Sequence, residues 1–208
     1  MNIILHKIIF LYLLIFICFP KISYAQSQWR ETQRDNGCIY YEGTVQDDVI
    51  PVRAVCEWDI PPASIHKSIA LISSHDLIFS RLTKSDSISQ HNDNKTPTET
   101  GLILQVHSFP GVTDRAAIME YSEQELPNGK RYLFVKSKNQ KALPSRYVEI
   151  EVNKGYWEVV QTKSGSKITF ETSYAPGGYL PSFLIQWFQV SGTKQVMDEL
   201  LMYVKKHL

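Results

Sequence analysis

The sequence lacks any cluster of basic residues. Its 208 residues carry 22 Lys and Arg against 21 Asp and Glu, a formal charge of +1. Nucleic-acid binding needs clustered Lys and Arg that displace counterions, so we expect no nucleic-acid partner. Charged residues make up 21% of the chain and apolar residues 43%, which excludes a largely disordered protein.

The sequence also lacks the spacings that mark common catalytic and metal sites. It has no His-Glu-x-x-His, no Gly-x-Ser-x-Gly and no glycine-rich phosphate loop. The histidines after residue 25 are His66, His75, His91, His107 and His207, and no spacing gathers them on one helical face. We therefore predict no catalytic residue, no metal and no cofactor, although a cluster that only folding assembles leaves no mark in a sequence.

Long apolar runs are absent except at the start of the chain. Twelve uncharged residues, 8–19, follow a lysine and end at a proline, and residues 23–25 read Ser-Tyr-Ala. This order is typical of a secretory signal peptide over residues 1–25, cleaved after Ala25. An uncleaved membrane anchor is the alternative, but a span needs about 20 apolar residues. We expect an exported protein, periplasmic or secreted, whose mature part is residues 26–208.

Few cysteines remain after this segment, namely Cys38 and Cys56. Residues 38–44 and 51–58 both have strand-like patterns and are joined through a Gln-Asp-Asp turn. A hairpin that turns about Asp47 places the two cysteines opposite one another, at a Cα separation of about 4.5–5.5 Å that a disulfide can span. An exported protein favours this bridge over two separate buried thiols.

The mature chain has the pattern of one α+β domain. Residues 26–36 are polar around Trp29 and predict a weak N-terminal helix. After Pro61-Pro62, apolar residues at spacings of four and three predict a second short helix. Residues 83–100 are almost wholly polar and predict a surface loop. Short β-branched and aromatic runs between tight breaks then predict antiparallel strands over residues 102–107, 116–123, 131–137, 146–152, 156–162 and 167–174.

A final apolar helix follows a Pro-Gly-Gly turn. One helical face carries Leu180, Leu184, Trp187, Phe188, Met197, Leu200, Leu201, Val204 and Leu208, with a candidate break at Ser191-Gly192. A twisted sheet of about eight strands needs cover on its concave face, and this helix is the long apolar element that can supply it. Incomplete contact between the two would leave a cavity lined by apolar and aromatic side chains.

These features resemble a StAR-related lipid-transfer (START) domain of the secreted bacterial form. Residues 37–41 and 52–62 are similar to the first two strands of the family. Residues 110–115 resemble its Trp-Pro-Val-x-x-Arg-Asp segment, although Pro110 stands in place of the Trp and Ala116 in place of the Asp. The most specific match is residues 175–184, a Pro-Gly-Gly turn that runs into the last helix.

The resemblance implies a helix-grip fold, a curved antiparallel β-sheet wrapped around a long C-terminal α-helix. It implies binding of a lipid or other hydrophobic small molecule in an internal cavity, by a monomer that contacts membranes transiently, and it leaves transfer of that ligand open as a further role. Two alternatives stay open. One is a cyclase- or aromatase-like enzyme that uses the same cavity, and the other is a protein-interaction module with a filled core.

The candidate ligand-binding residues come from the inward faces of the strands and of the last helix. We expect Tyr132, Phe134 and Tyr174 to line the cavity from the strands and Trp187 to line it from the helix, with core packing as the alternative role of each. Arg115 either meets a polar ligand head group at the rim or ties its loop to the sheet through backbone carbonyls.

Overall fold

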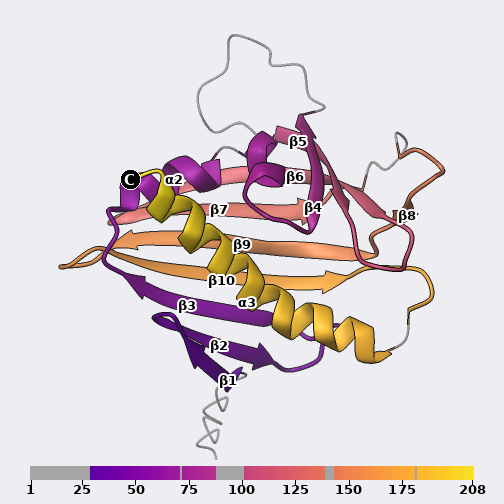
Figure 1. Cartoon of the computed structure of the whole chain (residues 1–208), viewed down its shortest axis with the longest axis horizontal. Helices are drawn as coiled ribbons and strands as arrows, with labels where there is room; N and C mark the ends of the chain where they lie inside the picture. The colour runs from indigo at the N-terminus through magenta and orange to yellow at the C-terminus, as the bar shows by residue number, and fades with distance from the viewer. Residues whose placement is uncertain (1–28, 71, 88–100, 139–142, 181) are drawn as a thin grey trace, which may run out of the picture.

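The computed structural model describes the chain from residue 29 to residue 208 with four gaps. It covers residues 29–70, 72–87, 101–138, 143–180 and 182–208, and of residues 72–74, 87, 182–184 and 186–190 it gives the backbone alone. The predicted signal peptide, residues 1–25, lies outside the described residues. The described part forms one curved β-sheet with helices on a single face (Figure 1).

The sheet contains ten strands in the order β1-β2-β3-β10-β9-β7-β6-β5-β4, with β8 beside β6. Every pair of neighbours is antiparallel except β6 with β8. The strands are β1 (Trp29–Asp35), β2 (Cys38–Gly43), β3 (Val52–Trp58), β4 (Leu82–Ser87), β5 (Gly101–His107), β6 (Arg115–Leu126), β7 (Gly129–Lys136), β8 (Val148–Glu149), β9 (Val152–Gln161) and β10 (Ser166–Ala175).

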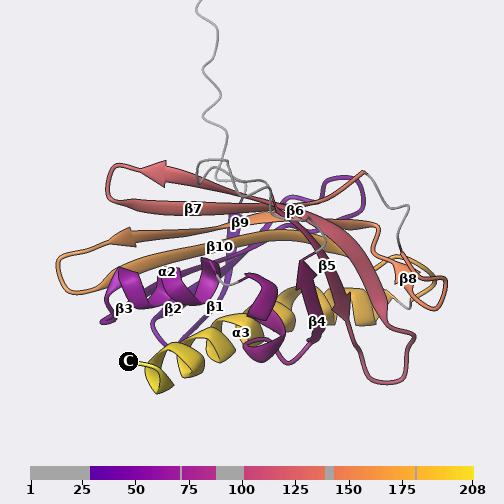
Figure 2. The ribbon, with the colours of Figure 1, turned by 90° about the horizontal axis from the view of Figure 1, so that it is seen from above.

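Three helical segments cover the concave face of this sheet. They are α2 (Pro62–Ala70), the 3-10 helix η1 (Ile72–Leu77) and α3 (Ser182–Lys206). α3 crosses the sheet diagonally (Figure 1). In the view from above, α2 and α3 lie on the same side and the β4–β5 pair bends toward them (Figure 2). This is the helix-grip arrangement that the sequence predicts.

Each α-helix buries the apolar residues whose spacing predicted it. α2 begins at Pro62, where a missing N–H costs nothing, and fully buries Ile65 and Ile69 against the sheet. The C-terminal half of α3 buries Met197, Leu200 and Val204, at spacings of three and four, each no more than 1% exposed. The core therefore lies between α3, α2 and the concave face of the sheet.

The β2–β3 hairpin confirms the predicted register. Cys38 pairs with Cys56, and the two form a disulfide. The chain turns at Asp47 and Asp48, whose φ angles of 50° and 61° are those of a two-residue turn that matches the twist of a hairpin.

Several predictions about local structure are wrong in whole or in part. Within the predicted helix 26–36, the described residues Trp29–Asp35 form the edge strand β1, which pairs with β2. Most side chains of β1 are exposed, so an apolar alternation that would mark it as a strand is missing. Of residues 146–152, only Val148–Glu149 forms a strand, and Val152 already belongs to β9. α3 continues through Ser191 and Gly192 without a break.

The polar segment 83–100 is a strand in its first part. β4 pairs with β5 through Ser87, and residues 88–100 lie outside the described residues. Among the described strands, β4 pairs with β5 alone and forms an edge of the sheet. Because an edge strand exposes polar residues, its sequence resembles that of a loop. The sheet accordingly has ten strands where the sequence predicts about eight.

A candidate ligand cavity beneath the C-terminal helix

A cavity of about 170 Å³ lies between α3 and the concave face of the sheet. Its walls come from seven strands of the sheet, from η1, from the segments that follow η1 and β5, and from residues 191–196 of α3. Most of the lining is apolar or aromatic. The residues discussed below are His75, Phe79, Arg81, Gln105, His107, Tyr121, Phe134, Asn153, Trp157, Phe170, Thr172, Tyr174, Gly192 and Gln195.

One end of the cavity is aromatic. Trp157 on β9 and Phe170 on β10 lie opposite one another in the sheet register, and their rings stack with centroids 4.1 Å apart. Phe134 stacks beside Phe170 at 6.2 Å and Phe79 beside Trp157 at 6.1 Å. Such a surface offers large apolar contact to a guest and no charge.

The other end is polar. Tyr174 lies four residues beyond Phe170 on β10, which is about 13 Å along a strand. It pairs with Asn153 of β9, and its ring lies 5.5 Å from the ring of His107 at the end of β5. The cavity is therefore polarised along the strands, from the Trp157–Phe170 stack to the polar end formed by His107, Asn153 and Tyr174.

The histidines and buried tyrosines that line the cavity are uncharged near pH 7. Burial lowers the pKa of His75 and of His107 to about 4. His75 Nε2 donates to the Ile69 carbonyl oxygen at 2.9 Å, which holds the ring in place. Burial also raises the pKa of the Tyr121 and Tyr174 hydroxyls, against a smaller opposite effect of a Gln105 hydrogen bond on Tyr121. These four side chains thus present hydrogen-bonding groups without formal charge.

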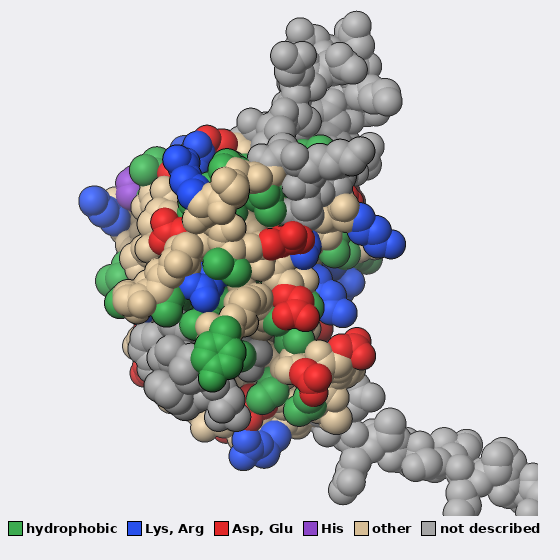
Figure 3. Space-filling view, turned by 90° about the vertical axis from the view of Figure 1, so that its right-hand side faces the viewer, with side chains coloured by type: hydrophobic (Ala, Val, Ile, Leu, Met, Phe, Trp, Pro, Cys, Tyr) green, Lys and Arg blue, Asp and Glu red, His purple; other side chains and the backbone are tan. Residues whose placement is uncertain are grey.

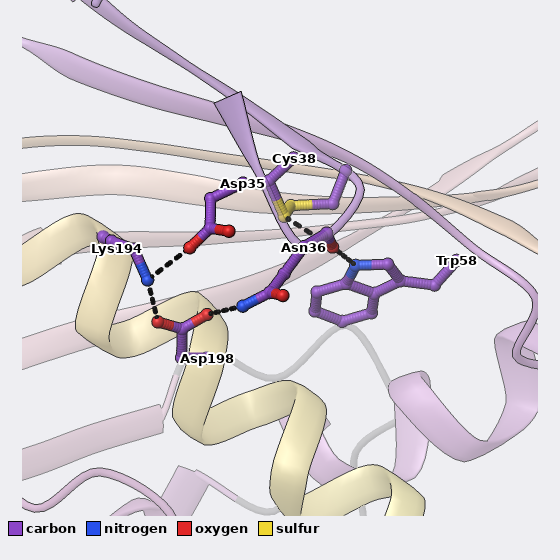
Figure 4. Close-up of a disulfide and its surroundings, with 7 residues drawn as sticks. Asp35, Asn36, Cys38, Trp58, Lys194 and Asp198 are labelled. Atoms are coloured by element: carbon purple, nitrogen blue, oxygen red, sulfur yellow. Dashed lines mark hydrogen bonds and ion pairs between the residues drawn. A yellow bond between two sulfur atoms is a disulfide. The ribbon is translucent and has the colours of Figure 1, made fainter. Parts of the chain in front are cut away.

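The α3 turn beside the cavity is fixed on one side by the first hairpin. Lys194 Nζ lies between the carboxylates of Asp35 and Asp198, 2.7 Å from Asp35 Oδ2, and Asn36 Nδ2 donates to Asp198 at 2.9 Å (Figure 4). The disulfide and the Trp58 indole, which donates to the Asn36 carbonyl at 3.1 Å, hold this corner (Figure 4). We call Asp35, Asn36, Lys194 and Asp198 the hairpin cluster.

A second polar cluster fixes the same part of α3 from the other side. The Ser80 N–H donates to Glu199 Oε2 at 3.0 Å, and Gln195 Nε2 donates to Ser80 Oγ at 2.7 Å. Arg81 Nε donates weakly to Gln195 Oε1 at 3.4 Å. Gln195 and Arg81 also line the cavity. Ser80, Gln195 and Glu199, the Ser80 cluster, therefore join the cavity wall to α3.

The structure places some of the predicted site residues in the cavity wall and others elsewhere. Phe134 and Tyr174 line the cavity. Tyr132 is buried in the core, and its hydroxyl bonds His66 Nδ1 at 3.0 Å. Arg115 is 3% exposed and donates through Nη1 to the Thr113 carbonyl, which is the structural role that the sequence left open. Trp187 lies on α3, but its side chain is outside the described residues. That any of them binds a ligand stays a prediction.

Several cavity residues were not among the predicted ones. Trp157 and Phe170 belong to runs that predict strands, but only their stacking across β9 and β10 singles them out. His107 has no motif around it, and its place at the polar end follows from the β5–β6 register. Ser191, Gly192 and Thr193 come from a turn of α3 where the sequence suggested a break.

A wider depression of about 720 Å³ lies on the outer face of the sheet. Arg53 crosses it, with Nε 2.8 Å from Glu171 Oε2 and its guanidinium 3.9 Å from the centre of the Trp29 ring. Lys154 and Glu120 also line this surface. Because exposed charges line the depression, an apolar guest gains less there than beneath α3.

The face of the molecule at the β8 end carries side chains of mixed character (Figure 3). At the β8 end of the molecule, hydrophobic, acidic and basic side chains are interspersed (Figure 3). In the part of the chain that the structure describes, no helix is long and apolar enough to cross a bilayer, and no His, Cys, Asp and Glu residues gather as metal ligands would.

No protein-family model matches the chain, and no curated protein sequence matches it. Solved structures are similar to its fold. The STAR-related lipid transfer protein from Xanthomonas axonopodis matches 86% of this chain and 99% of its own, with a TM-score of 0.74 and 15% identity. Human StAR-related lipid transfer protein 5 matches 97% and 95%, with a TM-score of 0.76 and 10% identity. The Zhui aromatase/cyclase from a Streptomyces species matches 75% and 93%, with a TM-score of 0.53 and 8% identity. The chain therefore has the helix-grip fold of START domains.

Proposed function

We propose that this protein binds a hydrophobic small molecule, a lipid or a compound of similar character, in the cavity beneath α3. The observation that carries the proposal is the polarised cavity itself, whose deep wall is the Trp157–Phe170 stack. Burying apolar surface against such a wall contributes about 25 cal/mol per Å², so binding needs shape and apolar character alone. Two structures of the same fold carry the name of lipid transfer proteins, which supports this reading.

The size of the cavity limits what fits without movement. About 170 Å³ is below the roughly 300–1,000 Å³ of drug-sized ligand sites and close to the roughly 150 Å³ of an engineered cavity that holds benzene. A guest of one ring or a short chain fits the cavity as it stands. A longer lipid requires α3 to move away from the sheet, and the hairpin and Ser80 clusters resist that movement. We therefore propose that the protein transfers a long lipid only if α3 moves away from the sheet in this way.

An enzyme in the same cavity is the alternative that one observation favours. His107 and Tyr174 meet at the polar end, and the Zhui aromatase/cyclase is similar in fold. However, no Asp or Glu is among the residues that line the cavity in the described structure, so neither ring has a carboxylate there to orient or activate it. Binding is therefore the function that the geometry supports better.

We also propose that the protein works outside the reducing cytosol. The signal-like pattern of residues 1–25 and the Cys38–Cys56 disulfide support this location. The mass of the chain recovered from the cell exterior or the periplasm would test it, since a mature protein begins at Gln26 and carries no free thiol.

A substitution at Gly192 tests ligand binding directly. Gly192 lies within α3 and lines the cavity, and a Cβ built there meets no atom within 4 Å. Gly192→Leu therefore places a side chain in the open space, while replacing a poor helix former with a good one, a gain of up to about 1 kcal/mol. We expect Gly192→Leu to be at least as stable as the wild type and to lose its guest.

Native mass spectrometry of freshly purified protein measures the guest, and chemical denaturation measures stability. Gly192→Ala is the matched control, because it improves the helix but leaves most of the space open. The proposal fails if the wild type carries no guest and takes up none from a mixture of lipids. It also fails if Gly192→Leu retains the same guest in the same amount.

A further inference from the structure

At and beside the polar end of the cavity, several buried polar groups lack a strong hydrogen-bond partner in the described structure. Arg115 carries five N–H donors, and within the described structure the acceptor bonded to it is the Thr113 carbonyl, while its Nε has no partner. The Asn153 side-chain amide bonds the sulfur of Met119 at 3.5 Å, and a thioether is a weak acceptor. His107 Nε2 is buried without a partner in the same part of the chain.

The sheet register places these groups around one spot. His107 on β5 faces Arg115 on β6, and Asn153 on β9 faces Tyr174 on β10. Residues directly opposite in an antiparallel pair project to the same face of the sheet. The His107–Tyr174 ring contact then joins the two pairs. The register and the ring contact thus bring His107, Arg115 and Asn153 to one region beside Tyr174, and His107 and Asn153 line the cavity there.

Arg115 places a buried positive charge beside this end, next to the lining residue His107, although Arg115 itself is not among the residues that line the cavity. Arg115 is 3% exposed, and no carboxylate forms an ion pair with it in the residues that the structure describes. The guanidinium acts on Tyr174, whose pKa its charge lowers against the larger raising effect of burial. A buried charge is costly unless an opposite charge or several hydrogen bonds accompany it. An anion with acceptor oxygens would complement both this charge and the N–H donors beside it.

We infer that the ligand is an amphiphilic acid whose carboxylate occupies the polar end, near His107, Asn153 and Arg115. Its apolar part lies along the cavity on the Trp157–Phe170 stack. The carboxylate supplies acceptor oxygens to the N–H donors of Arg115 and Asn153. It also neutralises the buried guanidinium, so the two charges offset each other's loss of solvation. This inference rests on the proposed function and adds the chemical class and the orientation of the ligand.

Head-group selectivity at constant chain length tests the inference. The full mature chain, stripped of guests, is titrated at pH 7.5 with decanoic acid, methyl decanoate, decan-1-ol and decylamine, and each Kd is measured by isothermal titration calorimetry. We expect the acid to bind at least about tenfold more tightly than the ester and the alcohol, the size of one hydrogen bond to a charged group. The amine should bind most weakly, because its charge repeats that of Arg115.

Two variants link the selectivity to the polar end. Arg115→Met and Asn153→Leu should each bring the Kd of the acid to within about threefold of that of the alcohol, with the Kd of the alcohol little changed. Arg53→Met is the matched control, since this arginine lies on the outer face with Glu171, and it should keep the full preference. If Arg115→Met does not fold, Asn153→Leu alone decides the question.

The outcomes separate this inference from the proposed function. If none of the four compounds binds the wild type, the proposed function fails and the inference fails with it. If the compounds bind with equal affinity, or the amine binds as tightly as the acid, the cavity binds apolar molecules and the inference alone is overturned. The same holds if Arg115→Met and Asn153→Leu both fold and keep the full preference for the acid.

Discussion

At the scale of single residues, the first hairpin depends on its two buried cysteines. Cys38 is 3% exposed and Cys56 is fully buried, both on the inner face of the sheet. Their bridge closes a loop with a sequence separation of 18 residues. In the chain-entropy model a loop of this length contributes about 3 kcal/mol, because the bridge restricts the unfolded chain.

Removal of the disulfide should therefore lower stability without changing the fold. We expect the Cys38→Ala/Cys56→Ala double variant to lose about 3 kcal/mol of unfolding free energy in urea titrations. Wild-type protein in dithiothreitol should lose a similar amount, whereas the double variant should not respond to the reductant. A wild-type midpoint that dithiothreitol leaves unchanged would show that the bridge does not stabilise the chain.

At the scale of elements, α3 both forms a wall of the cavity and is held to the sheet by polar side chains. The hairpin cluster joins it to the β1–β2 corner, and the Ser80 cluster joins it to the segment before β4. The ion pairs of the hairpin cluster are partly exposed: the Lys194 side chain is 30% exposed and that of Asp35 is 38% exposed. Such pairs contribute little to overall stability, but they lie beside the turn that must move if a long guest is to leave.

Loss of Lys194 should consequently affect ligand exchange more than folding. We expect Lys194→Met to speed release of a bound guest by about two- to five-fold, the range of an exposed ion pair, with little change in the unfolding midpoint. Stopped-flow transfer of guest to an excess of empty vesicles measures the release rate. Lys205→Met, at the exposed end of α3, is the control. Equal release rates for all three proteins would mean that α3 does not need to leave the hairpin cluster.

At the scale of the whole molecule, the open sheet is assembled from strands that lie far apart in the chain. β3 pairs with β10, so the first hairpin joins the sheet only beside the last strand before α3. This assembly buries His75 and His107 beneath α3, where both rings are neutral. His75 has Asp76 as its charged neighbour, and His107 lies near Tyr174 and opposite Arg115.

These buried histidines should make the protein sensitive to mild acid. A histidine has a pKa of about 6.5 in the unfolded chain and, at these two positions, of about 4 in the folded chain. As the pH falls from about 6.5 toward 4, the unfolded state takes up protons that the folded state does not, so stability falls. The loss reaches up to about 3 kcal/mol per histidine near pH 4, and the contribution is fully present above pH 6.5.

Urea unfolding between pH 7.5 and pH 4.5 measures this dependence. We expect His107→Phe to have a visibly shallower profile than the wild type, because one proton-binding group is removed from the unfolded state. His207→Gln, near the exposed C-terminus, should follow the wild-type profile. A His107→Phe profile that parallels the wild type would mean that His107 titrates alike in the folded and unfolded chains.

Much of the architecture followed from local patterns in the sequence. Apolar residues at helical spacing predicted α2 and α3, tight turns between β-branched runs predicted the central strands, and two cysteines in a short hairpin predicted the disulfide. The failures lie where the local signal is weak. β1 and β4 are polar edge strands, because one of their sides faces no other strand of the described sheet, and such strands resemble loops or weak helices.

The sequence predicted that an apolar cavity lies beneath the last helix, but it did not predict which residues line that cavity. The alternation of inward and outward positions selected Phe134 and Tyr174, which do line it. The same reasoning selected Tyr132, which lies in the core with its hydroxyl bonded to His66, since inward residues supply core and cavity wall alike. A sequence contains no measure of where a helix stands away from a sheet.

The sequence by itself determined that this chain has a curved sheet, a terminal apolar helix and a bridged hairpin, because periodicity, turns and cysteine spacing are local properties. It is the folded chain that brings His107, Asn153 and Tyr174 together at one end of a cavity and Trp157 and Phe170 together at the other. Those meetings depend on register and on the pairing of β3 with β10, which bring together residues that no short segment contains.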